Sequence, residues 1–484
     1  MNGPNLTDLA LLVPEMILVG AALTLILFAR RIQNASLVTA ATVVAALAAA
    51  VASIWLLADL PETGFKTGFG DMIVVDGYSQ FFKILIAAAL TLVTLLSVRT
   101  HGPPDPQTPG PTAQPTEYHA LLLLASTGMM FAASAVDLLT LYLALELMTL
   151  CSYILVGTTV NEPTSNEAAI KYFLLGSFAS ALFLYGIALT YGVTGATDFE
   201  TINKVLGETT LASNHILLAA IGLLTAGLAF KIAAFPFHAW APDAYQGASA
   251  PVAAFLAAAS KAAGLAALGR VCLVAFDFEG SVLFTVLVVI AALSIIVGSI
   301  IAMSQTNMKR LLAYSSIAHA GYALLGLISA TDAGASATMA YAFLYVFMTL
   351  GAFGVVIALG ERGESLDGYQ GLATQRPAIA ALMLLFLLSL TGIPPTAGFM
   401  AKFVVIQSAV SAGYWELAVL AVLCSVISAF VYLRVAVLMY MRDPREPEPA
   451  RFPLAVSAAI VVAALITVIG GIFPNSLLSW AVAP

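Results

Sequence analysis

Apolar segments long enough to cross a membrane recur along almost the whole chain and limit what it can fold into. We count about fourteen segments of roughly 20 residues, centred near residues 19, 47, 89, 127, 146, 180, 223, 260, 291, 317, 346, 391, 426 and 464. They do not alternate between apolar and polar residues as barrel strands do, and only helices or closed barrels satisfy the backbone in lipid. The sequence therefore predicts an all-α polytopic membrane protein.

The composition agrees with this fold class. Charged residues make up only 9% of the 484 positions and hydrophobic residues 61%, whereas about a quarter of the residues are charged in a soluble domain. The first apolar segment has no basic region before it and no suitably placed small-residue cleavage site. We therefore interpret it as a retained helix and not a signal peptide, and we expect the mature chain to begin near Met1.

The basic residues are distributed unevenly between the two sides of the predicted bundle. One set of alternate loops contains Arg30, Arg31, Arg99, Lys309, Arg310, Arg362, Arg376, Arg442, Arg445 and Arg451, whereas the other contains Lys66 and Lys204, with Arg270 near a helix end. Short cytoplasmic loops carry an excess of Lys and Arg. With an even number of helices, this predicts a multi-pass protein of a bacterial inner membrane with both termini on the periplasmic side.

Two proline-rich polar stretches divide the chain. The first is a predicted linker at residues 101–117, and the second, "MRDPREPEPARFP", precedes the last helix. Their proline content favours extended segments over helices. The sequence thus predicts three N-terminal transmembrane helices (1–100), the linker, a five-helix unit (118–273), a second five-helix unit (280–440) and a C-terminal helix (452–476).

Each five-helix unit contains an apolar helix that is interrupted by proline close to a lysine. The two segments are "FKIAAFPFHAW" at residues 230–240 and "LTGIPPTAGFMAKF" at residues 390–403. A unit with an odd number of helices is followed by a copy that enters from the other side, as in inverted-repeat transporters, whose ion sites lie at broken helices. The pattern predicts two inverted repeats around a buried ion pathway. The alternative is that both segments are ordinary kinks or loop entries.

Four ionisable residues lie deep in apolar segments: Glu146, Lys231, Lys261 and Lys402. A charge at the bilayer centre costs about 2.5–3.5 kcal/mol on insertion scales, so such a residue usually faces a protein interior or a hydrated cavity. Burial disfavours the charged form of an acid or a base, whereas a nearby opposite charge favours it. A buried Glu–Lys pair therefore changes its proton affinity when it separates, and further amines bridged by water or histidine can continue the transfer. The alternative is a set of structural ion pairs.

Other ionisable residues in the apolar segments are less central, namely Glu15, Lys83, Asp137, Lys171, His319 and Arg434. Lys83, Lys171 and Arg434 are close enough to helix ends for their side chains to extend to the membrane surface. His238 follows the proline break after Lys231 and is a further candidate for proton transfer. Its alternative role is that of a structural histidine with satisfied hydrogen bonds.

The chain carries no sign of a cofactor or metal site of its own. Cys151, Cys272 and Cys424 all lie in apolar segments, without a CxxC motif or a His/Cys cluster, and we interpret them as packing residues. No glycine-rich phosphate-binding loop is present in the sequence. We therefore expect no cofactor and no metal in this chain.

Three segments resemble one known family. "FKIAAFPFHAWAPDAYQGASAPVAAFLAAASKAAG", residues 230–264, resembles the signature of the antiporter-like membrane subunits of proton-pumping NADH:quinone oxidoreductase, or respiratory complex I, which are related to subunits of multisubunit cation/proton antiporters. "LALELMTLCSYILV" resembles the glutamate-bearing fifth helix of the family, and "LTGIPPTAGFMAKF" its broken twelfth helix. The resemblance extends from about residue 9 to 476 and implies fourteen helices with both termini outside.

The resemblance also implies roles for individual residues. Glu146 is implied to pair with Lys231, Lys261 to be the central relay lysine, and Lys402 to be the terminal one that faces the exit half-channel. A lysine instead of a glutamate at position 402 and the short C-terminus fit an N-type subunit of the family. "GASAPV" lacks a proline that is common one step earlier in the family motif, which affects the geometry of the loop and not the relay.

The resulting hypothesis is a proton-translocating membrane-arm subunit that couples quinone reduction elsewhere in the complex to proton transfer through the Glu/Lys relay. The resemblance implies FMN and iron–sulfur clusters in partner subunits, with quinone as the substrate of the complex. The implied partners are other membrane-arm subunits, both antiporter-like and small, and the lipid bilayer, without nucleic acid. Two alternatives are a subunit of a cation/proton antiporter and a passive scaffold whose charges only hold helices together.

Overall fold

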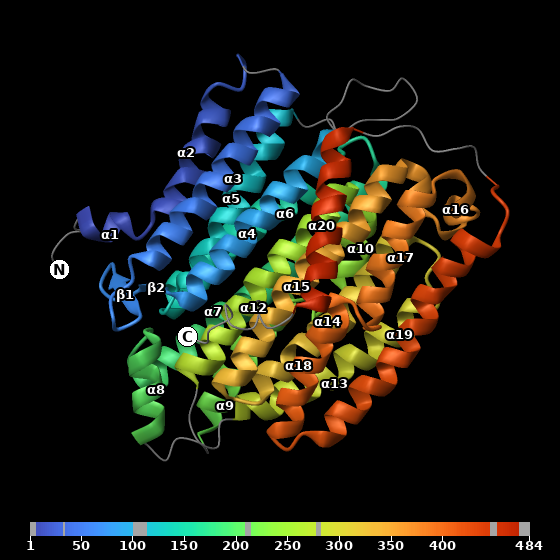
Figure 1. Ribbon diagram of the computed structural model, residues 1–484. Coiled ribbons are helices and arrows are strands. Elements are labelled where there is room, and N and C mark those ends of the chain that lie inside the picture. The colour runs from blue at the N-terminus through green and yellow to red at the C-terminus, as the bar shows by residue number, and fades with distance from the viewer. Residues whose placement is uncertain are drawn as a thin grey trace.

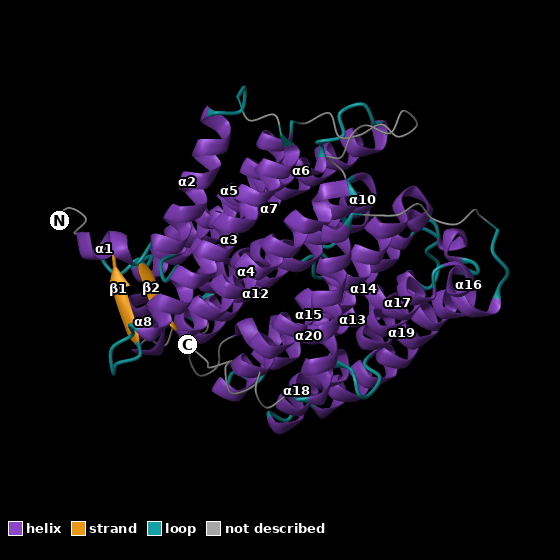
Figure 2. Ribbon diagram, turned by 45° about the horizontal axis from the view of Figure 1, so that its top comes forward, coloured by secondary structure: helices purple, strands orange, loops and turns teal. Residues whose placement is uncertain are grey.

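The chain folds into a bundle of long helices with one small two-stranded sheet at its edge (Figures 1 and 2). The computed structural model describes residues 6–31, 34–99, 114–208, 214–276, 282–445 and 453–473. The predicted all-α membrane architecture is confirmed, apart from the small sheet.

The N-terminal part of the bundle contains α1 (Leu6–Ala10), α2 (Val13–Leu27), α3 (Ala35–Ala58) and α4 (Gly77–Leu96), which ends in the 3₁₀ turn Ser97–Arg99. The antiparallel hairpin of β1 (Phe65–Gly68) and β2 (Ile73–Asp76) connects α3 to α4. Helix α1 and the hairpin lie at the same end of the bundle (Figure 2). The sequence analysis missed the hairpin because each strand has only four residues.

The middle of the chain forms α5 (Pro115–Ser134), α6 (Leu138–Val156), α7 (Pro163–Thr194), α8 (Phe199–Glu208), α9 (His215–Lys231), α10 (Trp240–Gly247), α11 (Ala250–Phe255) and α12 (Lys261–Arg270). Two π-helical turns flank α12, namely η3 (Leu256–Ser260) and η4 (Val271–Ala275). Together, α11 to η4 form one continuous apolar helix of 26 residues.

The last part of the chain forms α13 (Val282–Ala302), α14 (Met308–Ile328), α15 (Asp332–Leu359), α16 (Leu372–Gln375), α17 (Pro377–Thr391), α18 (Ala397–Ser411), α19 (Trp415–Met441) and α20 (Leu454–Ile472). The 3₁₀ turns η5 (Gly360–Glu364) and η6 (Leu366–Tyr369) follow α15.

Local sequence explains several helix starts. Backbone N–H groups of the first helical turn donate to side chains that include those of Asn34, Asp76, Asp137, Asn214, Asn307 and Thr331. Proline occupies the first turn of α5, where its missing N–H is not needed. Helix α5 consequently begins at Pro115, inside the predicted linker, of which residues 101–113 lie outside the described part of the chain.

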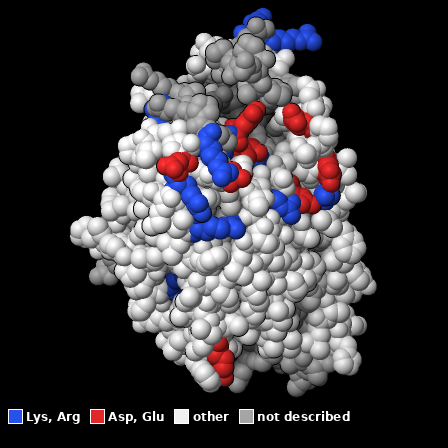
Figure 3. Space-filling view, turned by 90° about the vertical axis from the view of Figure 1, so that its right-hand side faces the viewer, with Lys and Arg blue, Asp and Glu red and all other residues white. Residues whose placement is uncertain are grey.

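Burial separates central from peripheral helices. The helix at residues 250–275 is buried along almost its whole length, and so are α14 and α15. By contrast, α3, α7, α13 and α19 expose large apolar side chains such as Val44, Phe178 and Val426, as expected for helices that face lipid. Figure 3 shows one side of the molecule, where most charged side chains gather in a band across the upper part and the broad surface below it carries few charges.

Each of the predicted segment centres falls inside a described helix, and both predicted interruptions are present. Helix α9 ends at Lys231 and α10 begins at Trp240, while α17 ends at Thr391 and α18 begins at Ala397. Within the described ranges, 10 helices are long and apolar enough to span a membrane, and four apolar helices are shorter. The number of fourteen crossings and the inverted relation of the two units remain predictions.

One sequence-based prediction is wrong. Lys83 does not extend to the membrane surface, because its side chain is 0% exposed and its Nζ lies 2.7 Å from Oε1 of the equally buried Glu15 on α2. The position of a lysine relative to a helix end does not reveal which face of the helix it occupies, and here that face points into the bundle.

Candidate functional site

The structure brings Glu146 and Lys231 together. Glu146 lies in the middle of α6 and Lys231 is the last residue of α9, with 3.7 Å between Oε1 and Nζ. Lys231 also donates a hydrogen bond of 3.2 Å to Thr149 Oγ1, and Ser180 of α7 donates one to Glu146. The side chain of Lys231 is 3% exposed and that of Glu146 21%. The two charges therefore form a pair between a buried lysine and a partly buried glutamate, with additional hydroxyl partners.

The break after α9 is fixed by contacts with neighbouring helices. The indole N–H of Trp240, where the chain becomes helical again, donates to the carbonyl oxygen of Phe230 at 3.1 Å. The backbone N–H of Phe235 donates to Ser294 Oγ of α13 at 2.9 Å. Irregular backbone at membrane depth is tolerated where protein satisfies it, and these bonds provide part of that satisfaction. They hold Lys231 at a helix end instead of within a regular helix.

Lys261 is buried in the centre of the bundle. Its Nζ donates to the carbonyl oxygen of Ser316 on α14 at 2.5 Å and to the hydroxyl of the same residue. The neighbouring Ser260 contacts Met148 Sδ of α6 at 3.8 Å. A Cβ placed on Gly264 would lie 3.4 Å from backbone and side-chain carbons of Lys231. The helix that carries Lys261 thus packs directly against the elements that carry Glu146 and Lys231.

Lys402 lies at the second break. It projects from α18 toward the end of α17, where its Nζ donates to the carbonyl oxygen of Thr391 at 2.8 Å and to Ser425 Oγ of α19 at 3.1 Å. The ammonium group also lies 4.5 Å from the centre of the Tyr322 ring on α14. The terminal carbonyl oxygen that the break exposes is therefore one of the groups that stabilise this buried charge.

Helix α14 connects the surroundings of Lys261 and Lys402. Ser316 binds Lys261, Tyr322 lies under Lys402, and His319 lies between them in the helix, three residues from each. His319 is buried within electrostatic reach of both lysines, and its Nδ1 lies 2.7 Å from the Tyr341 hydroxyl. The sequence analysis ranked His319 among the less central residues, although the spacing of three makes His319 a neighbour of both Ser316 and Tyr322 on the helix surface.

His238 does not lie among the described residues that form hydrogen bonds with the three buried lysines. It lies in the break between α9 and α10, is half-buried, and stacks on Phe235 with 5.3 Å between the ring centres. Its Nδ1 has no hydrogen-bond partner among the described residues. The stacking on Phe235 therefore does not connect His238 to Lys231 or Glu146.

The described ranges contain no group of three or more His, Cys, Asp or Glu side chains that could hold a metal ion. The three cysteines are buried and free. The site contains ionisable groups that are interspersed with hydroxyl groups inside the bundle. The ionisable groups are Glu146, Lys231, Lys261, His319 and Lys402. Such groups can bind, hold and release protons without a bound cofactor.

Comparisons with known proteins give the family. Residues 135–428 match the family described as NADH:quinone oxidoreductase/Mrp antiporter, transmembrane. The NADH-quinone oxidoreductase subunit N of Desulfovibrio desulfuricans is 43% identical over 99% of this chain and 97% of its own length. A subunit N of Rhizobium meliloti is 42% identical over 96% and 94% of the two chains.

Solved structures agree with the sequence matches. A chain of respiratory complex I from Thermus thermophilus has a TM-score of 0.80 and 34% identity, with 96% of this chain and 99% of that chain covered. A chain of the Mrp complex from Dietzia shares the fold, with a TM-score of 0.84 at 22% identity over 98% and 96% of the two chains. Since the family model matches more than half of the chain and the Desulfovibrio relative almost all of it, the chain belongs to the NADH:quinone oxidoreductase/Mrp antiporter transmembrane family, as its motifs predicted.

Proposed function

We propose that this chain is a proton-translocating membrane-arm subunit of an NADH:quinone oxidoreductase of the bacterial inner membrane. Its relatives of nearly equal length are N subunits of that enzyme. The chain then acts as part of a translocase and contains no redox centre, while FMN and iron–sulfur clusters reside in partner subunits. Quinone is the substrate of the assembled complex.

The observation that carries the proposal is the Glu146–Lys231 pair at the end of α9, in which Lys231 is buried and Glu146 is partly buried. The separation of 3.7 Å is short enough to favour the charged forms, and Lys231 is the last residue before the irregular backbone of the break. Separation of the pair removes the carboxylate that stabilises the ammonium group. Lys231 then releases its proton more readily.

From Lys231, the proton passes to Lys261, then by way of His319 to Lys402. Ser316, His319 and Tyr322 of α14 link the two later lysines. Restoration of the Glu146–Lys231 pair resets the relay for the next proton. His238, which stacks on Phe235 in the break, is a further candidate for proton entry.

The direction of transport follows from the proposed orientation. Arg30, Arg31, Arg442 and Arg445 lie in loops that we assign to the cytoplasm by the excess of basic residues. Both termini are then periplasmic. Protons enter the relay from the cytoplasm and leave by way of Lys402.

The test is Lys231→Ala in native inside-out membrane vesicles, with NADH-driven quinone reduction and proton uptake normalised to the complex assembled on a native gel. We expect both activities to be lost in a fully assembled complex, because the relay then lacks its switchable amine. Lys66→Ala is the matched control, since Lys66 forms an exposed ion pair with Asp59 outside the bundle. Undiminished pumping by Lys231→Ala would contradict the proposal.

A further inference from the structure

The helical piece that carries Lys261 is bounded by irregular backbone on both sides. Helix α12 has ten residues and lies between the π-helical turns η3 and η4. A π-helical turn interrupts the regular i→i−4 hydrogen bonds and often occurs at functional sites. The π-helical turns leave α12 less tightly fixed to the rest of its continuous helix, so side-chain contacts at its two ends contribute to its rotation and axial position.

The first end is held by Lys261, which binds Ser316. The other end is held by Arg270, whose guanidinium group makes a two-pronged ion pair with Asp76, with Nη1 to Oδ2 at 2.6 Å and Nη2 to Oδ1 at 2.9 Å. Nη2 also donates to the carbonyl oxygen of Ala133 on α5 at 3.2 Å. A bidentate pair restricts orientation as well as distance. Arg270 thus ties the end of α12 to α4 and α5.

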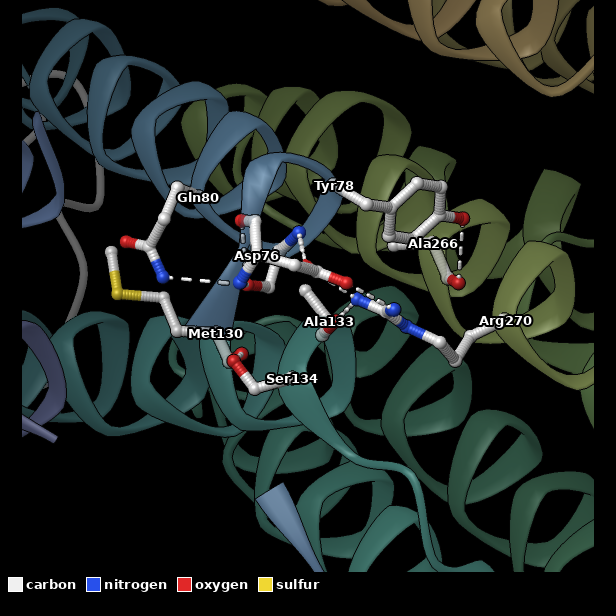
Figure 4. A network of polar contacts seen from close by, with 9 residues as sticks. Asp76, Tyr78, Gln80, Met130, Ala133, Ser134, Ala266 and Arg270 are labelled. Carbon is white, nitrogen blue, oxygen red and sulfur yellow. Dashed lines mark hydrogen bonds and ion pairs between the residues drawn. The ribbon is translucent and has the colours of Figure 1, made fainter. Parts of the chain in front are cut away.

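Tyr78 adds two contacts to the same place. The Arg270 guanidinium carbon lies 4.6 Å from the centre of the Tyr78 ring, and the Tyr78 hydroxyl donates to the carbonyl oxygen of Ala266 at 2.9 Å. Figure 4 shows Asp76 and Tyr78, from the start of α4, converging on Ala266 and Arg270. Two consecutive turns of α12 are therefore fixed to α4.

Asp76 is itself held in place. It caps α4, accepting from the Ser79 N–H at 2.7 Å, while its own N–H donates to Ser79 Oγ at 3.0 Å. Burial alone would raise the pKa of Asp76, but Arg270 and the hydrogen bonds from Ser79 hold that pKa below its usual value. Asp76 is 8% exposed and Arg270 2%. Asp76 and Arg270 therefore form a buried ion pair at the capped N-terminus of α4.

We propose that Asp76, Tyr78 and Arg270 form an anchor that positions Lys261 for proton transfer. Lys261 lies nine residues before Arg270, or about 13 Å along the helix, so that a change of rotation at the anchor moves its Nζ away from Ser316. None of the three residues transfers the proton; they are positioning residues. This inference rests on the proposed relay function.

The anchor is tested in the assembled complex with Arg270→Met, Asp76→Asn and Tyr78→Phe, measured as proton uptake and quinone reduction per assembled complex. We expect Arg270→Met and Asp76→Asn to lower both by about tenfold, since displacement of a reacting group by about 1 Å can cost up to about 100-fold. Tyr78→Phe keeps the ring and removes the bond to Ala266, and we expect a smaller loss. Arg270→Lys, which keeps the charge, restores part of the activity.

The matched control is Lys83→Met, which, like Arg270→Met, removes the basic partner of a buried ion pair of α4, but of a pair that holds α2 instead of α12. A positioning role predicts wild-type pumping per assembled complex in this control. Equal losses in the control and in Arg270→Met would identify a general structural role and overturn the inference. If Arg270→Met does not assemble, wild-type pumping by both Tyr78→Phe and Arg270→Lys would overturn it as well.

Lys231→Ala is measured in parallel to separate the anchor from the proposed function. Activity in Lys231→Ala would refute the relay itself. Inactive Lys231→Ala together with fully active anchor variants would refute only the anchor.

Discussion

Each buried ammonium group of the relay is held by at least one hydroxyl or carbonyl oxygen in addition to any carboxylate. Lys231 donates a hydrogen bond to Thr149 and Lys261 donates one to Ser316. Lys402 donates to Thr391 and Ser425. Of these three relay lysines, only Lys231 has a carboxylate partner within 4 Å among the described residues. Lys231 is therefore the lysine whose proton affinity depends most directly on a movable neighbour.

Thr149→Val tests the contribution of such a hydroxyl group. The change keeps the shape of the side chain but removes the bond to Lys231, and a hydrogen bond to a charged group contributes about 1.5 kcal/mol or more. We expect quinone-coupled proton uptake to fall by about tenfold. Thr225→Val is the control, because the Thr225 hydroxyl bonds within its own helix, to Ile221, and to nothing else among the described residues. Equal rates in the two variants would contradict this role of Thr149.

The sequence allowed the four central charges to be recognised, because charge is rare and costly in apolar helices. Their partners escaped prediction since serine, threonine and tyrosine are common in such helices and carry no signal until the helices are placed in space. Ser316 and Tyr322 are examples. For Lys83, distance from the helix end suggested the surface, whereas the unpredicted pairing with Glu15 determines its position.

At the scale of elements, close helix contacts position the relay. Helix α12 approaches the end of α9 at Gly264, where an added Cβ would lie 2.8 Å from Ile232 Cγ2. This approach brings Lys261 and Lys231 onto adjoining elements. The proline breaks were predictable because proline cannot continue a helix, but the π-helical turns around Lys261 have no comparable sequence signal.

Gly264→Ala tests this close packing. The added methyl group forces α12 and α9 apart, and overpacking of this kind costs about 1–3 kcal/mol. We expect a lower melting temperature of the complex and slower proton uptake. Gly222→Ala on α9 is the matched control, since an added Cβ there meets nothing within 4 Å. A Gly264→Ala complex as stable and active as the control would contradict the packing argument.

The Glu15–Lys83 pair links α2 to α4 and makes a separate prediction about stability. Lys83→Met alone leaves the Glu15 carboxylate buried without its partner, which costs about 3–5 kcal/mol. Glu15→Leu/Lys83→Met removes both charges and should restore stability to near that of the wild type. Melting temperatures and the yield of assembled complex measure both effects. A double variant as unstable as the single one would show that the pair itself stabilises the bundle.

At the scale of the whole molecule, the family membership and the multi-pass architecture predicted from the sequence are confirmed. The proposed assembly makes a prediction of its own. When the tagged chain is purified in mild detergent, flavin- and iron–sulfur-containing subunits with NADH dehydrogenase activity should accompany it. Copurification with small membrane subunits alone, without redox activity, would instead indicate a cation/proton antiporter.

The central claim is that buried amines of this chain carry protons, and Lys261→Met tests it most directly. Methionine has a similar length and no charge, and a buried charge that serves only packing can often be replaced in this way with little loss of stability. The measurement is NADH-driven proton uptake by inside-out vesicles per assembled complex. The account predicts that the complex assembles and that proton uptake is lost. Wild-type proton uptake in Lys261→Met would contradict the relay and leave the chain as a scaffold.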